Sequence, residues 1–302
     1  MSEKRIDDKT GTSTVGHEWD GIEELDTPMP RWWLWTLYAT IVFAIGYVIA
    51  YPALPGLSGA TPGLLGWTSH GELASDLAAE QKRLAPIRAA IAATPVSALL
   101  ANPKLLHAAE EGGRAAFKVH CVQCHGSGAA GSSGYPNLND DDWLWGGDID
   151  AIHTTLTNGI RQPGNDATRM SQMPAFGRDG ILDPRQIQDV VSYVRTLSGS
   201  QPASRSSQRG SLLYASNCTA CHGPDGKGNR SVGAPNLTDG IWLYGGDRAT
   251  LTTTVTNARY GVMPAWGRRL DPVTVKMLAA YVHSLGGGER TPAPAAISNA
   301  AH

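Results

Sequence analysis

The pentapeptide Cys121-Val122-Gln123-Cys124-His125 returns in the same form as Cys218-Thr219-Ala220-Cys221-His222. Both copies read C-x-x-C-H, the pattern for covalent attachment of a c-type haem. In such a site two thiols add across the haem vinyl groups, and the histidine behind them becomes an axial ligand of the iron. The two copies use all four cysteines of the chain. The sequence therefore predicts two covalently bound haem c groups with their iron, and leaves no thiol for a disulfide.

Two C-x-x-C pairs also suit a four-cysteine zinc site or a thioredoxin-like redox pair. A zinc site does not explain a histidine after both pairs, and a redox pair is expected beside a βαβ pattern that this sequence lacks. Haem attachment therefore accounts best for the motifs. Because haem c is attached outside the cytoplasm, the motifs also predict a periplasmic location.

An apolar run from Trp32 to Tyr51 carries no charged residue and is long enough to cross a bilayer as a helix. Arg31 precedes the run, and no Lys or Arg follows until Lys82, so the positive-inside rule places the N-terminus in the cytoplasm. The alternative is a signal peptide cleaved near Ser58-Gly59-Ala60, but such a peptide has a shorter apolar segment and a short basic start. We expect a retained single-pass anchor at 31–52 in the bacterial inner membrane.

The rest of the N-terminal part is polar or loop-like. With 25 Lys and Arg against 27 Asp and Glu, the chain has no basic field that would attract nucleic acid. Residues 1–30 are predicted to be a mostly disordered cytoplasmic tail. Residues 53–104 are predicted to be a periplasmic linker with an amphipathic helix from about Gly71 to Ala93, in which Pro86 is a candidate break or kink.

The residues around the two pentapeptides form an internal repeat. Each repeat reads as a helix running into C-x-x-C-H, a loop, a middle helix, a Met-Pro loop and a last helix. The repeats occupy 105–199 and 210–288, with a linker at 200–209, a disordered tail at 289–302, and an insertion in the first repeat from about Arg161 to Arg169. The matching segments are Gly113/Gly210, Phe117/Tyr214, Pro136-Asn137-Leu138/Pro235-Asn236-Leu237, Trp143–Asp148/Trp242–Asp247, Met173–Gly177/Met263–Gly267 and Tyr193/Tyr281.

This order of elements resembles the class I cytochrome c domain. The fold class implied is all-α, with one N-terminal transmembrane helix followed by two tandem class I cytochrome c domains. In that family a methionine before the last helix is the sixth iron ligand, which implies Met173 and Met263 here as partners of His125 and His222. Pairing within each repeat is the default expectation, although two facing domains could exchange their methionines.

The resemblance also implies supporting roles. A proline carbonyl accepts a hydrogen bond from the ligating imidazole in this family, which implies Pro136 and Pro235. Trp143 and Trp242 are expected either to donate hydrogen bonds to haem propionates or to pack against the edge of the haem ring. Arg161 and Arg259 are propionate candidates, with surface solvation as the preferred interpretation. Structural or core-filling roles are expected for Met170, Met277, His120, His153 and His283.

An iron with histidine and methionine ligands has no open position, so such a centre passes electrons. The whole chain resembles the dihaem membrane-anchored subunit III of cbb3-type cytochrome c oxidases. The segment Trp32–Tyr38 and the Trp-Leu-Trp/Tyr-Gly-Gly-Asp repeats carry this resemblance. It implies a subunit that is not itself an enzyme and accepts electrons from a soluble cytochrome c or the cytochrome bc complex. The electrons would pass through a monohaem cytochrome c subunit to the catalytic haem–copper subunit, which reduces O₂ and pumps protons.

Two other classes of protein stay open at this point. One is the cytochrome subunit of a periplasmic dehydrogenase, which differs in the partners that purify with it. The other is a dihaem peroxidase, which needs one haem with an exchangeable sixth ligand. The Met-Pro-Ala segment in both repeats argues against the peroxidase.

Overall fold

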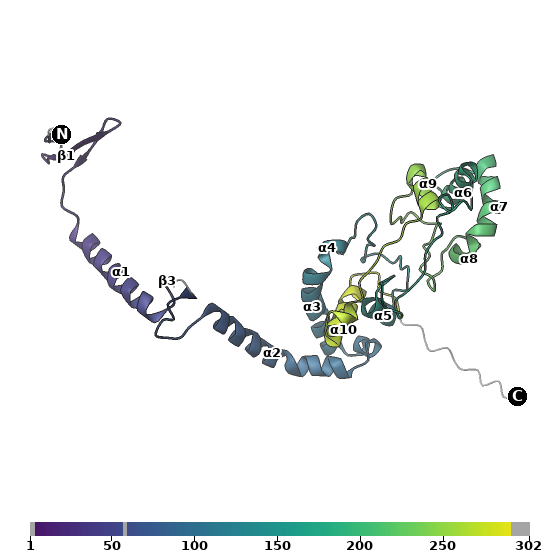
Figure 1. Cartoon of the computed structure of the whole chain (residues 1–302), viewed down its shortest axis with the longest axis horizontal. Coiled ribbons are helices and arrows are strands. Elements are labelled where there is room, and N and C mark those ends of the chain that lie inside the picture. Colours follow the sequence, from purple (N-terminus) through teal and green to yellow (C-terminus); the bar gives the residue numbers. More distant parts are fainter. Residues whose placement is uncertain (1–3, 57–58, 291–302) are drawn as a thin grey trace. The chain divides into compact units, whose positions relative to one another are not determined.

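The computed structural model describes residues 4–56 and 59–290 of the 302-residue chain. The chain divides into two compact units at Arg83 and Leu84. Helices dominate both units, as predicted, and the strands between Arg5 and Thr61 are short (Figure 1). The tail expected at 289–302 lies outside the described residues from residue 291 onward.

The N-terminal segment contains a β-hairpin, which corrects the expectation of a mostly disordered tail. Strand β1 (Thr14–Trp19) pairs antiparallel with β2 (Ile22–Leu25). Asp20 and Gly21 connect them with φ of 49° and 85°. Positive φ at both turn residues is the geometry that Asp-Gly favours in tight hairpins, so this dipeptide was a readable signal for the turn.

Helix α1 (Arg31–Ala50) coincides with the predicted anchor. Its 20 residues span about 30 Å at 1.5 Å per residue, the thickness of a bilayer core. Among the described residues it is the one helix long and apolar enough to cross a membrane. Beyond its end, the Tyr51 ring meets the Trp67 ring edge-on at 5.7 Å, which fits an interfacial aromatic belt. The short strands β3 (Pro55–Gly56) and β4 (Gly59–Ala60) pair beyond the helix.

Helix α2 (Ser69–Ala93) runs through Pro86 without the break that the sequence suggested. Its C-terminal turns belong to the second unit, where Ile91 is fully buried. There Arg88 forms an ion pair with Asp271 at 2.8 Å. The end of this helix is therefore fixed to the part of the chain that carries the two pentapeptides.

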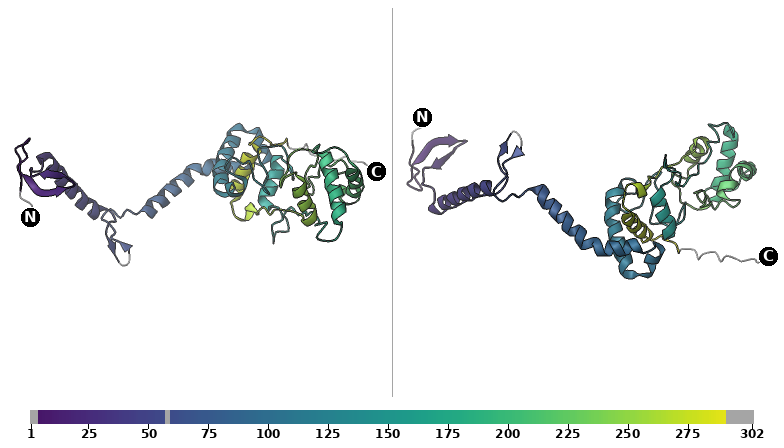
Figure 2. Two further views of the ribbon diagram at one scale, coloured as in Figure 1. Left: turned by 90° about the horizontal axis from the view of Figure 1, so that it is seen from above. Right: turned by 60° about the horizontal axis from the view of Figure 1, so that its bottom comes forward.

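Two hydrophobic cores organise the second unit, and each contains helices from both repeats. In the first core α3 (Pro103–His120) packs against α10 (Pro272–His283), and in the second α6 (Pro184–Leu197) packs against α7 (Arg205–Asn217). Figures 1 and 2 show α10 beside α3, and α6 beside α7. The last helix of each repeat thus packs on the first helix of the other, so the two repeats are not the two packing units.

Shorter elements complete the two cores. The first core also holds η1 (Ser97–Ala101), α4 (Val122–His125), α5 (Ile149–Asn158) and η2 (Trp266–Arg268). The second core also holds α9 (Arg248–Asn257) and Cys218, which directly precedes α8 (Thr219–His222). Each core therefore has one pentapeptide and one middle helix.

A glycine allows each helix pair to approach closely. A Cβ on Gly113 of α3 would overlap the carbonyl of Met277 on α10, and one on Gly210 of α7 would overlap the carbonyl of Asp189 on α6. These two glycines occupy matching positions of the repeats. The same backbone contact therefore forms in both cores, each time between different repeats.

An aromatic pair follows each glycine contact. The rings of Phe117 and Tyr281 meet edge-on with centroids 5.4 Å apart, and those of Tyr193 and Tyr214 with centroids 5.2 Å apart. Phe117 and Tyr214 match between the repeats, as do Tyr281 and Tyr193. Edge-to-face aromatic pairs add to the stability gained from their buried area, so both crossings are reinforced in the same way.

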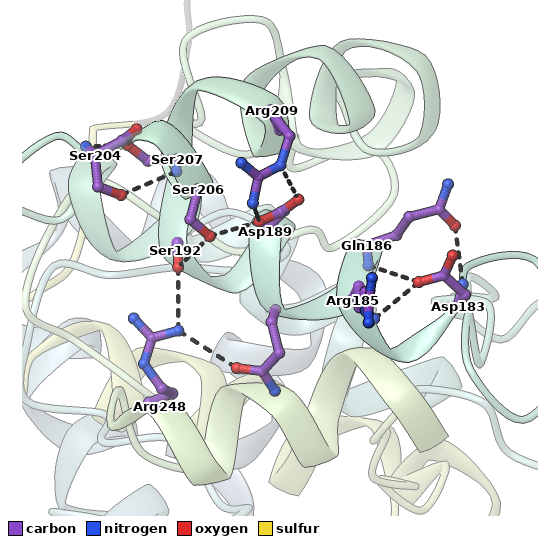
Figure 3. A network of polar contacts seen from close by, with 11 residues as sticks. Asp183, Arg185, Gln186, Asp189, Ser192, Ser204, Ser206, Ser207, Arg209 and Arg248 are labelled. Atoms are coloured by element: carbon purple, nitrogen blue, oxygen red, sulfur yellow. Dashed lines mark hydrogen bonds and ion pairs between the residues drawn. The ribbon is translucent and has the colours of Figure 1, made fainter.

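A polar network distinguishes the second core from the first (Figure 3). Asp189 is only 8% exposed. Its carboxylate accepts hydrogen bonds from Nε and Nη2 of Arg209, both at 2.7 Å, and from the Ser206 hydroxyl at 2.6 Å. These bonds, those of Arg209 first, lower the pKa of Asp189. Arg248 of α9 joins by donating to the Ser192 hydroxyl at 3.1 Å, so three helices share the network.

Two expected loop segments are more ordered than predicted. Helix α7 begins inside the linker expected at 200–209, because Ser204 and Ser207 form a reciprocal capping box. At the other end, Glu289 is paired with Arg230 through two bonds of 2.6 and 2.8 Å. The serine-rich composition of this segment suggested a linker, but two of its serines, three residues apart, cap the start of a helix.

Replacing Arg209 with Met should destabilise the second core, because it removes both guanidinium donors from a buried carboxylate. We expect the free energy of unfolding to fall by about 1–3 kcal/mol, the cost of an unsatisfied buried acceptor. Since the pKa of folded Asp189 is lowered, the stabilisation is present above the ordinary aspartate pKa and is lost as the pH falls through the folded pKa. Denaturant unfolding of the full chain in detergent, followed by circular dichroism, measures the effect.

The matched control is Arg114→Met on α3. Arg114 pairs with Glu111 at 2.9 Å, and both side chains are about half exposed. Exposed pairs of this kind contribute under about 0.5 kcal/mol. Equal losses of stability in the two variants would show that the Asp189 network does not stabilise the second core.

Candidate haem sites

Each pentapeptide forms one helical turn at the end of a longer helix. Cys121 ends α3 with its N–H bonded to the Phe117 carbonyl at 2.9 Å, and Cys218 ends α7 in the same way on Tyr214. The second cysteine and the histidine follow within α4 or α8. Because residues three apart on a helix are neighbours, the two thiols of each motif lie on one side of the turn.

Both motif histidines are oriented by a proline carbonyl. Nδ1 of His125 lies 3.2 Å from the Pro136 oxygen, and Nδ1 of His222 lies 3.0 Å from the Pro235 oxygen. With the Nδ1 proton donated there, Nε2 is free to bind a metal. Burial lowers the pKa of both imidazoles and outweighs the opposing effect of the proline carbonyls. Both rings therefore favour the neutral, metal-binding form.

The cysteine environments distinguish between the three interpretations of the motifs. Burial, with a smaller contribution from the second cysteine, raises the pKa of Cys121 and of Cys218 to about 11. A thioredoxin-type redox pair instead lowers the pKa of its reactive thiol. All four cysteines lie in the described part of the chain, and no disulfide joins any two of them. Within that part no three His, Cys, Asp or Glu side chains cluster as a metal site would require. These features favour haem attachment.

A mostly apolar pocket opens beside the first motif. It has about 730 Å³ of space free of protein atoms, including its open mouth, within the range of ligand and cofactor sites. Cys121 and His125 line it together with Met263 of the second repeat. Two backbone hydrogen bonds of 3.0 Å between Ile160 and Met263 hold this methionine in place. The pocket therefore contains a thioether supplied by the other repeat.

The second motif has the converse arrangement. Met173 of the first repeat packs against the same buried cluster as Cys218 and Trp242. The N–H groups of Gly177 and Arg178 donate to one carbonyl at the end of α9, at 3.1 and 2.9 Å. The structure therefore places each methionine in the core that holds the other repeat's motif, which is the exchanged arrangement that the sequence left open. Exchange of the last helices carries the preceding methionine into the opposite core.

Arginine side chains beside aromatic residues of both repeats fit the carboxylates of a haem. The Arg169 guanidinium lies 5.4 Å from the Trp145 ring, and the Arg259 guanidinium lies 5.3 Å from the matching Tyr244 ring. Nε of Arg169 is buried and has no hydrogen-bond partner in the described part of the chain. An unpaired cationic donor beside the first pocket suits a propionate. Sequence reasoning missed Arg169 because it was assigned to the insertion. Counting back from the matched methionines would have found it, since Arg169 precedes Met173 by four residues and Arg259 precedes Met263 by four.

The two tryptophans of the Trp-Leu-x-Gly-Gly-Asp segments pack over glycine. Trp143 donates its indole N–H to the Gly287 carbonyl at 2.6 Å, so this donor is already satisfied. A Cβ on Gly147 would overlap the Trp143 ring, and one on Gly246 would overlap the Trp242 ring. The second glycine of each segment is therefore required by the indole above it, and packing is the role of Trp143.

The remaining candidates divide into supporting and exposed residues. Met277 is buried in the first core, as expected, whereas Met170 is 67% exposed and does not fill a core. Nε2 of His283 bonds a backbone carbonyl at 2.9 Å, and the His120 ring lies 5.5 Å from that of Trp266. Both histidines have structural contacts, as predicted.

Three family profiles match successive parts of the chain. They are described as the N-terminal domain of cytochrome oxidase-cbb3, FixP (residues 11–58), cytochrome c (110–198) and cytochrome C oxidase, cbb3-type, subunit III (205–282). The chain is 57% identical over 290 residues to the cbb3-type cytochrome c oxidase subunit CcoP of Cereibacter sphaeroides, covering 96% of this chain and 100% of that protein. The FixP subunit of Azorhizobium caulinodans is 51% identical over 285 residues, covering 94% and 96%. The FixP subunit of a Bradyrhizobium species is 52% identical over 286 residues, covering 94% and 98%.

An aspartate with a displaced pKa lies at the first pocket. Asp142 lines this pocket and also a second cavity, which Pro136 and Asn137 line together with Pro235. Burial first, then the negative charges of Asp239, Asp140 and Asp141, raise its pKa to about 6, while Arg230 opposes the shift. The charge of Asp142 therefore changes within the range of ordinary buffers.

We expect the redox potential of the first site to depend on pH through Asp142. As the pH rises through about 6, the carboxylate ionises, and its negative charge stabilises the oxidised iron and lowers the midpoint potential. Asp142→Asn should flatten this dependence. Spectroelectrochemical titration on both sides of pH 6 measures it. The exposed Asp166 of the insertion provides a control, since Asp166→Asn should keep the wild-type dependence of the midpoint potential on pH. If Asp142→Asn also kept that dependence, Asp142 would not be its cause.

Proposed function

This chain belongs to the family of cbb3-type cytochrome c oxidase subunit III, and from its geometry we infer how it serves as the electron-transfer subunit of that oxidase. It carries two covalently bound haem c groups and a membrane-spanning anchor, α1. Other subunits of the oxidase are its partners. The observation that carries the inference is the presence of Met263 in the same pocket as His125.

We propose that each haem is held by one repeat and completed by the other. The first haem would be bound by Cys121, Cys124 and His125 with Met263 as sixth ligand, and the second by Cys218, Cys221 and His222 with Met173. A bound haem c supplies one-electron Fe(II)/Fe(III) chemistry, and a thioether ligand raises its potential. Held by a histidine and a methionine in this way, each iron would have no open position for O₂ or peroxide, and the chain would be a relay rather than an enzyme.

The chain's own groups tune and protect these sites. The carbonyls of Pro136 and Pro235 hold the imidazoles in the tautomer that leaves Nε2 free. The apolar lining of the first pocket, which includes Phe117 and Leu156, excludes water from the ligands. Both features favour a fixed coordination that changes little between oxidation states.

The surroundings of the relay follow from the anchor. Arg31 precedes α1 and no further Lys or Arg occurs before Lys82, which supports a cytoplasmic N-terminus and periplasmic haem sites. In that location the subunit would accept electrons from a soluble cytochrome c or the cytochrome bc complex. It would deliver them through a monohaem cytochrome c subunit to the catalytic haem–copper subunit.

Purification of the native complex tests this function. We expect haem b and copper to accompany haem c, and the ferrous haems of the isolated chain to resist CO. A complex with a quinone cofactor or flavin in place of haem b and copper would favour a dehydrogenase. A high-spin haem c that binds CO readily would contradict the relay.

Replacement of either methionine should affect one haem. Met263→Leu removes a ligand that favours reduced iron, so the midpoint potential of one haem should fall by at least about 59 mV, a tenfold change for one electron. Met173→Leu should lower the other potential. Redox titration of both variants and of the double variant measures the two shifts.

A spectroscopic label identifies which haem responds. Cys124→Ala leaves one vinyl group conjugated with the first haem and moves its absorption to longer wavelength. In this background Met263→Leu should lower the potential of the shifted band, and Met173→Leu that of the unshifted band. The reverse assignment would show that ligation follows the repeats and not the exchanged helices.

A further inference from the structure

Arg161 occupies an unusual place between the two methionine loops, which are residues 171–177 and 261–267. It lies three residues after α5, with a positive φ of 52°. Its N–H bonds the Arg169 carbonyl at 2.9 Å, and its side chain is half-buried. The sequence favoured surface solvation for this arginine, and the structure corrects that expectation.

The Arg161 guanidinium binds one carbonyl in each methionine loop. Nε donates to the Gly261 oxygen at 2.7 Å, and Nη1 donates to the Ser171 oxygen at 2.8 Å. Gly261 stands two residues before Met263, and Ser171 stands two residues before Met173. One side chain therefore joins the equivalent backbone position of both loops.

Arginine suits this position better than any other residue. Its planar guanidinium presents several N–H donors in a fixed fork, so it can bond two diverging carbonyls at once. The Tyr260 ring lies 5.9 Å from the guanidinium carbon and restrains its orientation. Burial lowers the pKa of Arg161, and the tyrosines Tyr244 and Tyr260 oppose this shift. The side chain stays cationic, because arginine ordinarily loses its proton only far above neutral pH.

The second repeat does not supply an equivalent residue. Counting from the matched Asn158 and Asn257, the position of Arg161 is occupied by Tyr260. The backbone pairing of Ile160 with Met263 brings Arg161 to the second loop. A single arginine thus supports two loops that otherwise belong to different cores.

We propose that Arg161 is a positioning residue that holds both methionine loops, so that ligation at the two haem sites is coupled. The proposal rests on the ligand pairs proposed above. It has a specific consequence: loss of this one side chain loosens both methionines, whereas loss of either methionine changes one site.

The experiment compares Arg161→Met with the wild-type chain, both full-length in detergent. The readouts are the far-red charge-transfer band of methionine-ligated ferric haem and the binding of imidazole, which competes with the thioether. We expect the band to weaken at both haems and the imidazole affinity of both to rise about tenfold, equivalent to about 1.4 kcal/mol of lost support at each loop. A change at one haem, or at neither, overturns the proposal.

Two further variants separate this role from a general structural one. Arg161→Lys keeps the charge but not the planar fork, so it should weaken both bands in part. It replaces Arg161→Met in the experiment if that variant does not fold. Arg268 donates to the Gly164 carbonyl at 2.9 Å in the same insertion, and Arg268→Met should leave both bands unchanged. If Arg268→Met also removed both bands, the effect of Arg161→Met would be explained by general loss of loop stability, and the proposal would be overturned.

The methionine variants keep the two proposals distinguishable. If Met173→Leu and Met263→Leu each remove one band while Arg161→Met retains both, the proposed ligand pairs are supported and the positioning role of Arg161 is contradicted. If neither methionine variant removes a band, the proposed ligand pairs are contradicted, and the positioning role of Arg161 is contradicted with them.

Discussion

The crossing of helices at two glycines is the contact on which the haem-bearing unit depends. Either repeat could in principle pair its own first and last helices, because both repeats have the glycine and the aromatic residues. The side chains around the two crossings disfavour pairing of helices within one repeat. Gly112 of α3 stands where α7 has Arg209, and Met277 of α10 stands where α6 has Asp189. Pairing within a repeat would bury Asp189 against a helix without its arginine, and an unpaired buried carboxylate is costly.

Exchange of the last helices has a direct consequence for the two haem sites. Because each methionine loop precedes a last helix, the loop is carried into the opposite core with it. Met263 then lines the same pocket as His125, and Met173 lies against the cluster that contains Cys218. Neither repeat contains a complete set of histidine and methionine in its own core. The integrity of each site therefore depends on the packing of both repeats.

Local features of the structure were predictable, and the long-range pairing was not. The C-x-x-C-H motifs and the anchor follow from residue spacing and hydropathy, which act within a few residues, and the proline carbonyls were implied by the resemblance to the cytochrome c domain. Which first helix packs on which last helix cannot be predicted from local sequence, because the two repeats have the same motifs in the same order. The deciding information lies in the contrast between Asp189 with Arg209 and Met277 with Gly112, which has meaning only once the helices are seen to cross. The Asp20-Gly21 turn, by contrast, was a local signal.

The insertion at 161–169 makes two sites of similar sequence physically different. Both sites have an arginine over an aromatic ring, Arg169 over Trp145 and Arg259 over Tyr244. The insertion adds Arg161, which donates to a carbonyl in each methionine loop. Asp142 adds an ionisable carboxylate at the first pocket. Charge and burial around a haem are among the factors that set its potential. Two centres with the same ligands can therefore differ in potential, and a difference in potential is what gives a pair of relays a direction.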